Sequence, residues 1–433
     1  MSVSDAFLLK ARWVLPVEPA GVVFEHYSVV VQDGRILDVL PSATAVQRYP
    51  TFPSVSLDQH ILIPGFVNAH THAAMALLRG FSDDLPLMTW LTEHIWPAEA
   101  HWVSPAFVRE GTLLAAAEML SGGVTCFNDM YFFPEEIAEA ALTVGIRACV
   151  GLIVLDFPTA WAANATHYLD RALVVHDRLH GVPLIRTALT PHAPYTVSDA
   201  PLERVRALSE AWDVPIHMHV HETATEVQNG ERPLARLARL GLLSPRLVAV
   251  HMTQLTEAEI DACARTGVQV VHCPESNLKL ASGFCPVVRL RAAGVNVSIG
   301  TDGAASNNDL DMLGELRTAA LLAKAVAGDA AALSAHEAIR LATLGGAQAL
   351  GMGGEIGSIV AGKAADLVAL DLSGLATEPV YHAASALVYS AVRTAVTDVW
   401  VAGRRVVHNR VLTTVDTSAV LDKARAWRQR IAQ

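Results

Sequence analysis

The fold of this chain is decided by the stretch Pro64-Gly65-Phe66-Val67-Asn68-Ala69-His70-Thr71-His72. The apolar run before it, Ile61-Leu62-Ile63, predicts a buried strand that leads into the two histidines. Residues two apart on a strand point to the same face, so His70 and His72 can both reach one metal ion. A His-x-His pair alone is more often two solvated loop histidines than a metal site. The rest of the chain therefore has to decide between these interpretations.

Strand-like runs alternate with amphipathic helices outward from this stretch. The predicted strands are Leu62–Asn68, Val124–Asn128, Arg147–Val154, Leu184–Leu189, Pro215–Val220, Leu247–His251, Val268–Cys273 and Val295–Gly300. Eight strands with helices between them are typical of a (β/α)8, or TIM-type, barrel of about 250 residues. An open doubly wound sheet is the alternative, but no glycine-rich phosphate fingerprint follows the early strands.

Both ends of the chain predict β structure instead. Asp33-Gly34 is a hairpin signal between Tyr27–Gln32 and Arg35–Leu40. Near the other end, Ala402-Gly403 separates two further strand-like runs, and a final helix is predicted over Ser418–Ile431. With 433 residues the chain exceeds a usual single core. We expect residues 61–356 to form the barrel, and residues 1–60 with 357–433 to form a small β-sandwich domain that carries the C-terminal helix.

Composition excludes several classes of protein. The net charge is −11 and no basic stripe is visible, so nucleic acid is not an expected partner. No apolar run reaches the ~18–20 residues of a membrane span. The first residues, Met1–Ala6, lack the features of a signal peptide. The five cysteines form no Cys-x-x-Cys, which favours a reducing, cytoplasmic location.

Polar residues gather where predicted strands end, which is where barrels of this kind build their active sites. They are His70 and His72 after the first strand, His192 after the fourth, His219 and Glu222 at the fifth, His251 at the sixth and Asp302 at the eighth. Each also has a purely structural interpretation: Asp302 as a turn residue or helix cap, His251 as a satisfied core histidine, His192 as a rigid loop residue. His217, His219 and His221 share one predicted strand face, and three inward imidazoles are too many polar groups for a plain core. We expect one of them to be a ligand and the others to contact substrate or structure.

Taken together, these motifs resemble the amidohydrolase superfamily. The resemblance rests on Pro64–His72, His219 with Glu222, His251 and Gly300-Thr301-Asp302-Gly303. Three segments are similar to the 5′-methylthioadenosine/S-adenosylhomocysteine deaminases of that superfamily, namely Asp84–Leu91, Ser276–Gly283 and Asp302–Asn308. The resemblance runs nearly end to end, although guanine deaminases and triazine chlorohydrolases share parts of these segments.

The resemblance implies one divalent metal, held by His70, His72, His219 and Asp302. Zinc is expected, with iron and manganese as alternatives that the same donors accept. Binuclear relatives usually place a lysine at the fourth strand end, and Leu184–His192 contains none, which supports a single metal. The zinc deaminase plan that needs Cys-x-x-Cys is excluded, because the chain has none.

The implied reaction is hydrolytic deamination of 5′-methylthioadenosine to its inosine analogue and ammonia, with S-adenosylhomocysteine and adenosine as further substrates. Asp302 and His251 would orient the activated water and take its proton, and Glu222 would protonate a ring nitrogen of the purine. His192 would hydrogen-bond the base, and Trp90 would pack on the substrate, unless Trp90 only packs within its own helix. We prefer 5′-methylthioadenosine because no arginine can be placed against the homocysteine carboxylate.

Two alternatives stay open. The same scaffold could deaminate or dechlorinate another heterocycle, such as guanine, a pterin or a triazine, because loops decide the substrate. A non-catalytic nucleoside-binding relative is the other, and the intact ligand set with Glu222 speaks against it. A homodimer is expected from family habit.

Overall fold

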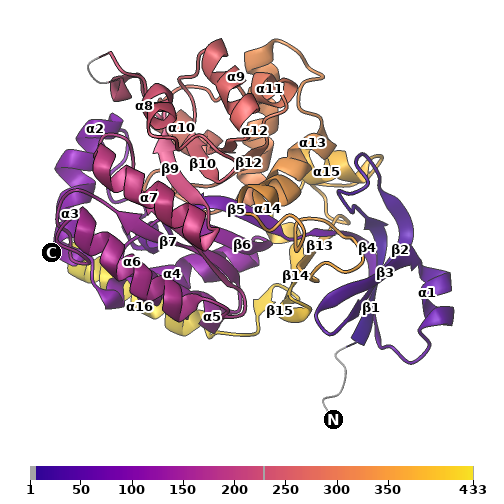
Figure 1. The fold of residues 1–433 in the computed structure, drawn as a ribbon. Helices are drawn as coiled ribbons and strands as arrows, with labels where there is room; N and C mark the ends of the chain where they lie inside the picture. The colour runs from indigo at the N-terminus through magenta and orange to yellow at the C-terminus, as the bar shows by residue number, and fades with distance from the viewer. Residues whose placement is uncertain (1–5, 228–229, 433) are drawn as a thin grey trace.

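The computed structural model describes residues 6–227 and 230–432. Its centre is a barrel of eight parallel strands that hydrogen-bond in chain order (Figure 1). The strands are β5 (Phe66–Thr71), β6 (Val124–Asp129), β7 (Arg147–Val154), β8 (Ile185–Pro191), β9 (Ile216–Val220), β10 (Leu247–His251), β11 (Gln269–His272) and β12 (Val297–Ile299). The first and last strands meet where the Asp302 N–H donates to the carbonyl of His70 over 3.0 Å. The predicted barrel is therefore confirmed.

Helices cover the outside of the barrel (Figure 1). They are α4 (Pro105–Ser121), α5 (Pro134–Val144), α6 (Ala165–Leu179), α7 (Asp199–Trp212), α8 (Pro233–Arg239), α9 (Glu257–Thr266), α11 (Val287–Ala292) and α12 (Met312–Ala327). Helix α4 begins as predicted, with the Ser104 side chain accepting from the Phe107 N–H and Pro105 in the first turn. The strands are buried on both faces, because the barrel interior and the helix layer enclose them; every residue of β7 is buried.

Shorter helices complete this part of the chain. Between β5 and α4 lie a 3-10 helix (Ala73–Leu78), α2 (Leu87–Thr89), a π-helix (Trp90–Ile95) and α3 (Trp96–Trp102). Further along are a 3-10 helix (Ala224–Glu226), α10 (Pro274–Lys279), α13 (Ala335–Arg340), a π-helix (Leu341–Gly345) and α14 (Gly346–Ala349).

The predicted first strand, Leu62–Asn68, is wrong in one respect, because two strands occupy it. Ile61-Leu62-Ile63 belongs to β4 (Ser54–Pro64), which pairs with β1 and β13 outside the barrel. The barrel strand β5 begins only after Gly65. A Cβ at Gly65 would lie 2.0 Å from Thr125 Oγ1, so the chain passes too close to β6 for any side chain there. This glycine separates the two sheets.

The second sheet is mixed and is built from both chain ends. Its order is β16-β15-β14-β13-β4-β1-β2-β3. The strands are β1 (Ala6–Val14), β2 (Phe24–Gln32), β3 (Arg35–Pro41), β4, β13 (Leu367–Asp371), β14 (Val396–Val401), β15 (Arg404–His408) and β16 (Val411–Leu412), with the helices α1 (Ser42–Arg48) and α15 (Ala383–Tyr389) and a 3-10 helix (Arg393–Ala395) nearby. The small β domain expected from the two ends is therefore present.

Both predicted hairpin turns are found in this sheet. Asp33 and Gly34 have φ values of 51° and 77°, and Ala402 and Gly403 have 47° and 77°. Positive φ at both central positions matches the twist of the flanking strands. The two turns touch: a Cβ on Gly34 would lie 2.6 Å from the carbonyl oxygen of Ala402.

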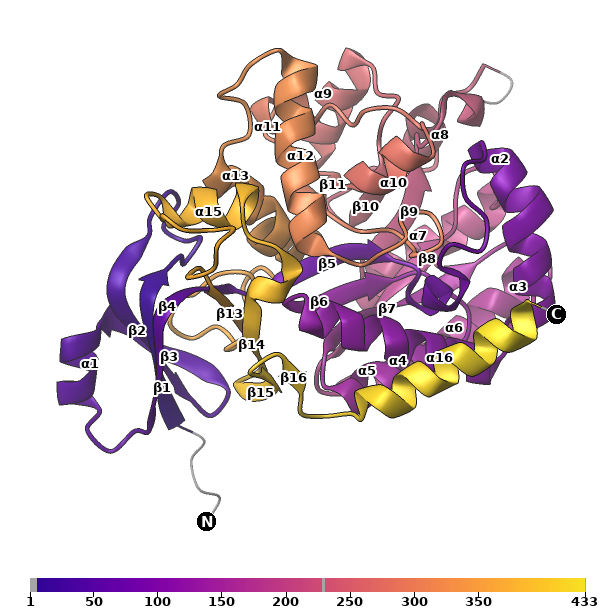
Figure 2. The same cartoon turned by 180° about the vertical axis from the view of Figure 1, so that it is seen from behind.

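The final helix, α16 (Thr417–Ile431), leaves the small sheet and lies along the barrel helix α4 (Figure 2). Trp427 stacks edge-on against Phe107 of α4 at 5.3 Å and donates to Glu110 Oε2 over 2.6 Å. The division of the chain at residues 60 and 356 stays a prediction.

The remaining expectations concern the whole chain. Across residues 6–227 and 230–432, no helix combines the length and the apolar character needed to cross a bilayer. All five cysteines are buried and unpaired. Met1–Asp5, most of the stretch considered for a signal peptide, lies outside the described residues. The cytoplasmic location and the homodimer stay predictions.

Candidate metal centre and active site

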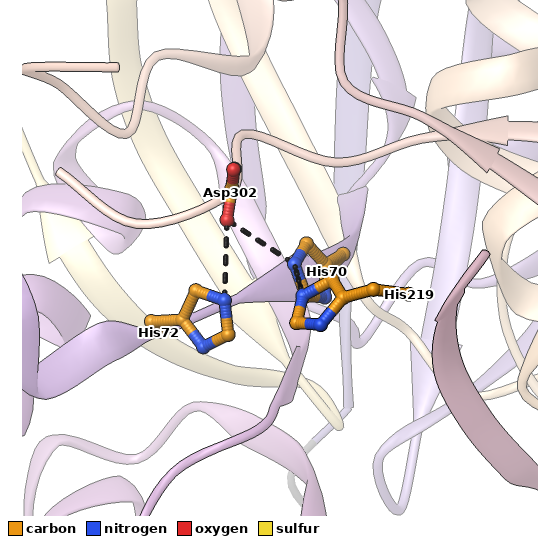
Figure 3. A group of neighbouring side chains, drawn as sticks. All are labelled: His70, His72, His219 and Asp302. Atoms are coloured by element: carbon orange, nitrogen blue, oxygen red, sulfur yellow. Dashed lines mark hydrogen bonds and ion pairs between the residues drawn. The ribbon is translucent and has the colours of Figure 1, made fainter. Parts of the chain in front are cut away.

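Four side chains from distant parts of the chain converge at the carboxyl end of the barrel (Figure 3). They are His70 on β5, His72 just after it, His219 on β9 and Asp302 after β12, and their ligating atoms lie within 4.8 Å of one another. Asp302 Oδ1 is 3.2 Å from His70 Nε2 and 3.3 Å from His72 Nε2. His219 Nε2 is 3.2 Å from His70 Nε2. The four residues predicted as metal ligands are thus brought together.

The other ring nitrogen of each histidine has its own partner. Nδ1 of His72 donates to the carbonyl of Met130 over 2.6 Å, and Nδ1 of His219 donates to the carbonyl of His192 over 2.8 Å. Nδ1 of His70 is hydrogen-bonded to Nε2 of His217 at 3.0 Å. Such partners orient the rings and leave Nε2 as the free donor toward a metal. Three imidazoles and one carboxylate suit zinc and its first-row neighbours, so the residues fit the expected divalent metal.

Close backbone approach brings Asp302 to the histidines. A Cβ on Gly300 would lie 2.7 Å from the backbone nitrogen of His70, so only glycine lets β12 come this near β5. Asp302 itself has a left-handed φ of 63°. Its Oδ2 accepts from the hydroxyls of Ser276 at 2.7 Å and Ser306 at 3.0 Å. Oδ1 is therefore turned toward the histidines while Oδ2 is held on the other side.

Glu222 and His251 lie beside this centre. His251 Nε2 is 3.8 Å from Glu222 Oε2, and both side chains are buried. Burial, reinforced by the neighbouring carboxylates of Asp302 and Glu226, raises the pKa of Glu222 well above its usual range. The raised pKa favours the protonated form of Glu222. A buried, protonated carboxylic acid is what a general acid requires.

His251 stays neutral for a related reason. Burial, the largest cause, lowers its pKa to about 3. The side-chain amide of Asn277 donates to Nδ1 of His251 over 2.9 Å. The single ring proton therefore sits on Nε2, and His251 is a hydrogen-bond donor at the site.

A cavity of about 360 Å³ opens above these groups. Of the residues singled out from the sequence, His72, Trp90, His192, His219, Glu222, His251 and Asp302 line it. Trp90 belongs to the π-helix after β5, and its indole N–H donates to the carbonyl of Ser82 over 2.9 Å. Burial lowers the pKa of His192 to about 3, so this ring is neutral too. His70 is fully buried beneath the floor of the cavity.

Comparison with known proteins places this site in a family. The model of the amidohydrolase family matches residues 61–406. The chain belongs to the amidohydrolase family. A 5-methylthioadenosine/S-adenosylhomocysteine deaminase of Saccharophagus degradans is 48% identical over 429 residues, covering 98% of this chain and 96% of that protein. A protein of the same name from Teredinibacter turnerae is 47% identical over 430 residues, covering 98% and 97%. The resemblance found in the motifs is therefore confirmed.

Solved structures agree with the fold of this amidohydrolase. An adenosine deaminase from Xanthomonas campestris with bound zinc is 57% identical, covers 98% of both chains and superimposes with a TM-score of 0.96. A triazine hydrolase variant has a TM-score of 0.91 at 23% identity, so it shares the fold alone. This amidohydrolase is a metal-dependent hydrolase that acts on C–N bonds.

One expectation about this amidohydrolase is wrong. His221 does not share the inward strand face of His217 and His219, because β9 ends at Val220 and His221 has a φ of 55°. Its Nε2 lies 2.9 Å from Glu259 Oε1 instead. The predicted alternation holds only while the backbone is extended.

Several residues at the site of this amidohydrolase were not assigned a role from the sequence. Glu99 of α3 lines the cavity, accepts from the Tyr131 hydroxyl over 2.7 Å and has its pKa raised to about 7, chiefly by burial. The sequence feature that could have pointed to Glu99 is a carboxylate among mostly apolar residues in a helical segment. Ser276 and Ser306 are hydrogen-bonded to Asp302, Asn277 to His251 and Glu226 to the backbone of Glu222, and spacing alone does not reveal such pairings.

Proposed function

We propose that this amidohydrolase deaminates adenosine-type nucleosides by hydrolysis, with 5′-methylthioadenosine as its preferred substrate and adenosine as a further one. The observation that carries the proposal is the buried carboxyl of Glu222 beside His251, next to the group of four predicted ligands that borders the cavity. Burial raises the pKa of this carboxyl, which favours its protonated form. The full-length relatives named as 5-methylthioadenosine/S-adenosylhomocysteine deaminases and the neighbour named as an adenosine deaminase support it. The zinc of that neighbour supports zinc as the metal.

The chemistry divides among few residues. His70, His72, His219 and Asp302 would hold the metal, which when bound lowers the pKa of water and so supplies hydroxide near neutral pH. The carboxylate of Asp302 would take the water proton, and the hydroxyls of Ser276 and Ser306 keep that carboxylate in place through its Oδ2. The same proton would then go to the departing amine, which leaves as ammonia. The hydroxyl that stays on the carbon would lose its proton as the C=O forms, and that proton restores Glu222.

Glu222 and His251 act on the substrate side. Glu222 gives its proton to the purine nitrogen beside the amino-bearing carbon, which makes that carbon more electrophilic. General acid steps of this kind contribute about 10²–10⁴-fold. His251 orients the water through its Nε2 proton and is not the base, because Asn277 occupies Nδ1 and the ring stays neutral. His192 and Trp90 both line the cavity. In this proposal His192 would hydrogen-bond the base and Trp90 would pack against it.

The cavity wall favours an uncharged 5′ substituent. Its apolar residues include Leu87, Trp96, Val103 and Phe157. Among the cavity-lining residues in the described part of the chain, none is lysine or arginine. The carboxylate of a homocysteine group would be desolvated there without a cation to pair with, which costs free energy. A methylthio group carries no charge and has no such cost. Glu99 offers the sugar hydroxyls a polar partner on this wall.

Ammonia release from a panel of substrates tests the proposal. We expect the metal-loaded enzyme to act on 5′-methylthioadenosine and adenosine with kcat/KM about tenfold or more above that for S-adenosylhomocysteine, because an unpaired charge costs about 1.5–3 kcal/mol. Guanine, a pterin and a triazine complete the panel. Release from one of these alone would contradict the proposal, and nucleoside binding without ammonia release from any compound would favour a non-catalytic role.

The variant Glu222→Gln tests the proton donor in the same assay. It removes the proton donor but none of the four ligands, so turnover should fall by about 10²–10⁴-fold. Metal content, measured by elemental analysis, should stay at that of the wild type. Full turnover by this variant would remove Glu222 from the reaction.

A further inference from the structure

The carboxylate of Glu226 accepts hydrogen bonds from three consecutive backbone N–H groups, those of residues 221–223. Its Oε2 accepts from His221 over 2.9 Å. Its Oε1 accepts from Glu222 itself over 2.5 Å and from Thr223 over 3.1 Å. Burial raises the pKa of Glu226, and the three N–H donors act in the opposite direction because they stabilise its charged form. Glu226 is buried, so water does not compete for these donors.

The backbone at this point needs such a partner. The chain leaves β9 after Val220, and the left-handed φ of His221 turns the next N–H groups away from the sheet. Glu226 ends a single 3-10 turn, Ala224–Glu226, whose capping box with Thr223 returns its carboxylate to these donors. On the opposite side, the Thr253 hydroxyl donates to the carbonyl of Glu222 over 2.7 Å. The peptide units of Glu222 are thus held from both sides.

We propose that Glu226 is a positioning residue, which fixes the backbone from which Glu222 reaches the reacting purine. The proposal rests on the proposed function, because it needs Glu222 as the proton donor. Glu226 makes no hydrogen bond to the four ligand side chains in the described residues, so its effect passes through Glu222 rather than through the metal. A misplacement of the donor by about 1 Å is enough to cost a large factor in rate.

A double-mutant cycle tests this. In Glu226→Gln one oxygen still accepts, but the amide NH2 faces a backbone N–H, so the donor segment loses its fixed position. We expect kcat to fall about tenfold or more, with KM for 5′-methylthioadenosine and metal content nearly unchanged. In the Glu222→Gln background the same change should alter kcat by less than about twofold, because residues that act through one group are not additive.

Glu231→Gln is the matched control. Glu231 is an acidic residue five positions along that pairs with Arg239 at the surface, and its loss should leave kcat unchanged. Circular dichroism and thermal unfolding would check that the Glu226→Gln variant is folded. Wild-type kcat in Glu226→Gln, or an equal loss in both backgrounds, would overturn the positioning role alone. Full activity of Glu222→Gln would overturn the proposed function together with it.

Discussion

At the scale of single residues, the site depends on which ring nitrogen each histidine turns inward. His72 and His219 are oriented by backbone carbonyls, whereas His70 is oriented by another side chain, His217. Nδ1 of His70 is hydrogen-bonded to Nε2 of His217, and Nδ1 of His217 is in turn 2.8 Å from the side-chain amide of Asn128. A buried imidazole without that partner would rotate or change tautomer more easily. His217 is therefore the neighbour whose loss should be felt at the metal.

We expect His217→Leu to lower metal affinity by roughly 10–100-fold, the usual effect of removing an orienting partner. Competition with a chelator of known affinity measures it. His217→Gln, which keeps a side-chain acceptor, should lose less. Equal affinity in wild type and His217→Leu would show that His70 needs no such partner.

At the scale of elements, the barrel and the small sheet are joined by a buried ion pair. Arg147 begins β7, and Asp366 directly precedes β13. The guanidinium binds both carboxylate oxygens of Asp366, at 3.1 and 3.2 Å, and also Glu355 at 3.0 Å. The Asp366 side chain is 1% exposed, so its charge has no water to replace a lost partner. Breaking the pair from one side should thus be costly.

Arg147→Ala should reduce the free energy of unfolding by about 3–5 kcal/mol, because it leaves Asp366 buried and unpaired. Urea titration followed by fluorescence measures the change. Arg186→Ala is the control, since Arg186 binds the same Glu355 at 3.2 Å but is 60% exposed. That change should cost no more than about 1 kcal/mol. Similar losses in both variants would contradict the importance of burial.

At the scale of the whole molecule, the barrel interior keeps many histidines uncharged. Burial lowers the pKa of His192, His251 and His272 to about 3 each. In the unfolded chain these rings have a pKa near 6.5. Between these values the unfolded chain binds protons that the folded protein does not. Stability is therefore fully present above about pH 6.5 and is lost as the pH falls toward 3.

The variant His272→Leu removes the contribution of one buried histidine to the pH dependence of stability. His272 lies on β11 and is not one of the four ligands. Each such histidine steepens the loss of stability by up to ~1.4 kcal/mol per pH unit between about pH 6 and 4. Thermal unfolding at several pH values should show a shallower pH dependence in the variant. A slope equal to that of the wild type would mean that His272 is not held neutral by burial.

The sequence by itself determined the strand and helix order of the barrel, and its resemblance to a known family pointed to the four residues that the fold brings together. Strand and helix periodicity are local properties, and the pattern of apolar residues carries them without reference to the rest of the fold. The placement of His70, His219 and Asp302 at strand ends then implies that they meet, because parallel strands in a barrel end at one rim.

Only the tertiary structure decided where neighbouring segments diverge and which residues support the site. Ile61-Leu62-Ile63 joins a different sheet from His70 because Gly65 passes against Thr125, a contact between residues 60 positions apart. His221 leaves the inward face because its φ is positive. Glu226 matters because its carboxylate returns to three backbone N–H groups. Such features depend on backbone angles and on the distance between specific atoms, and no spacing of residue types encodes them.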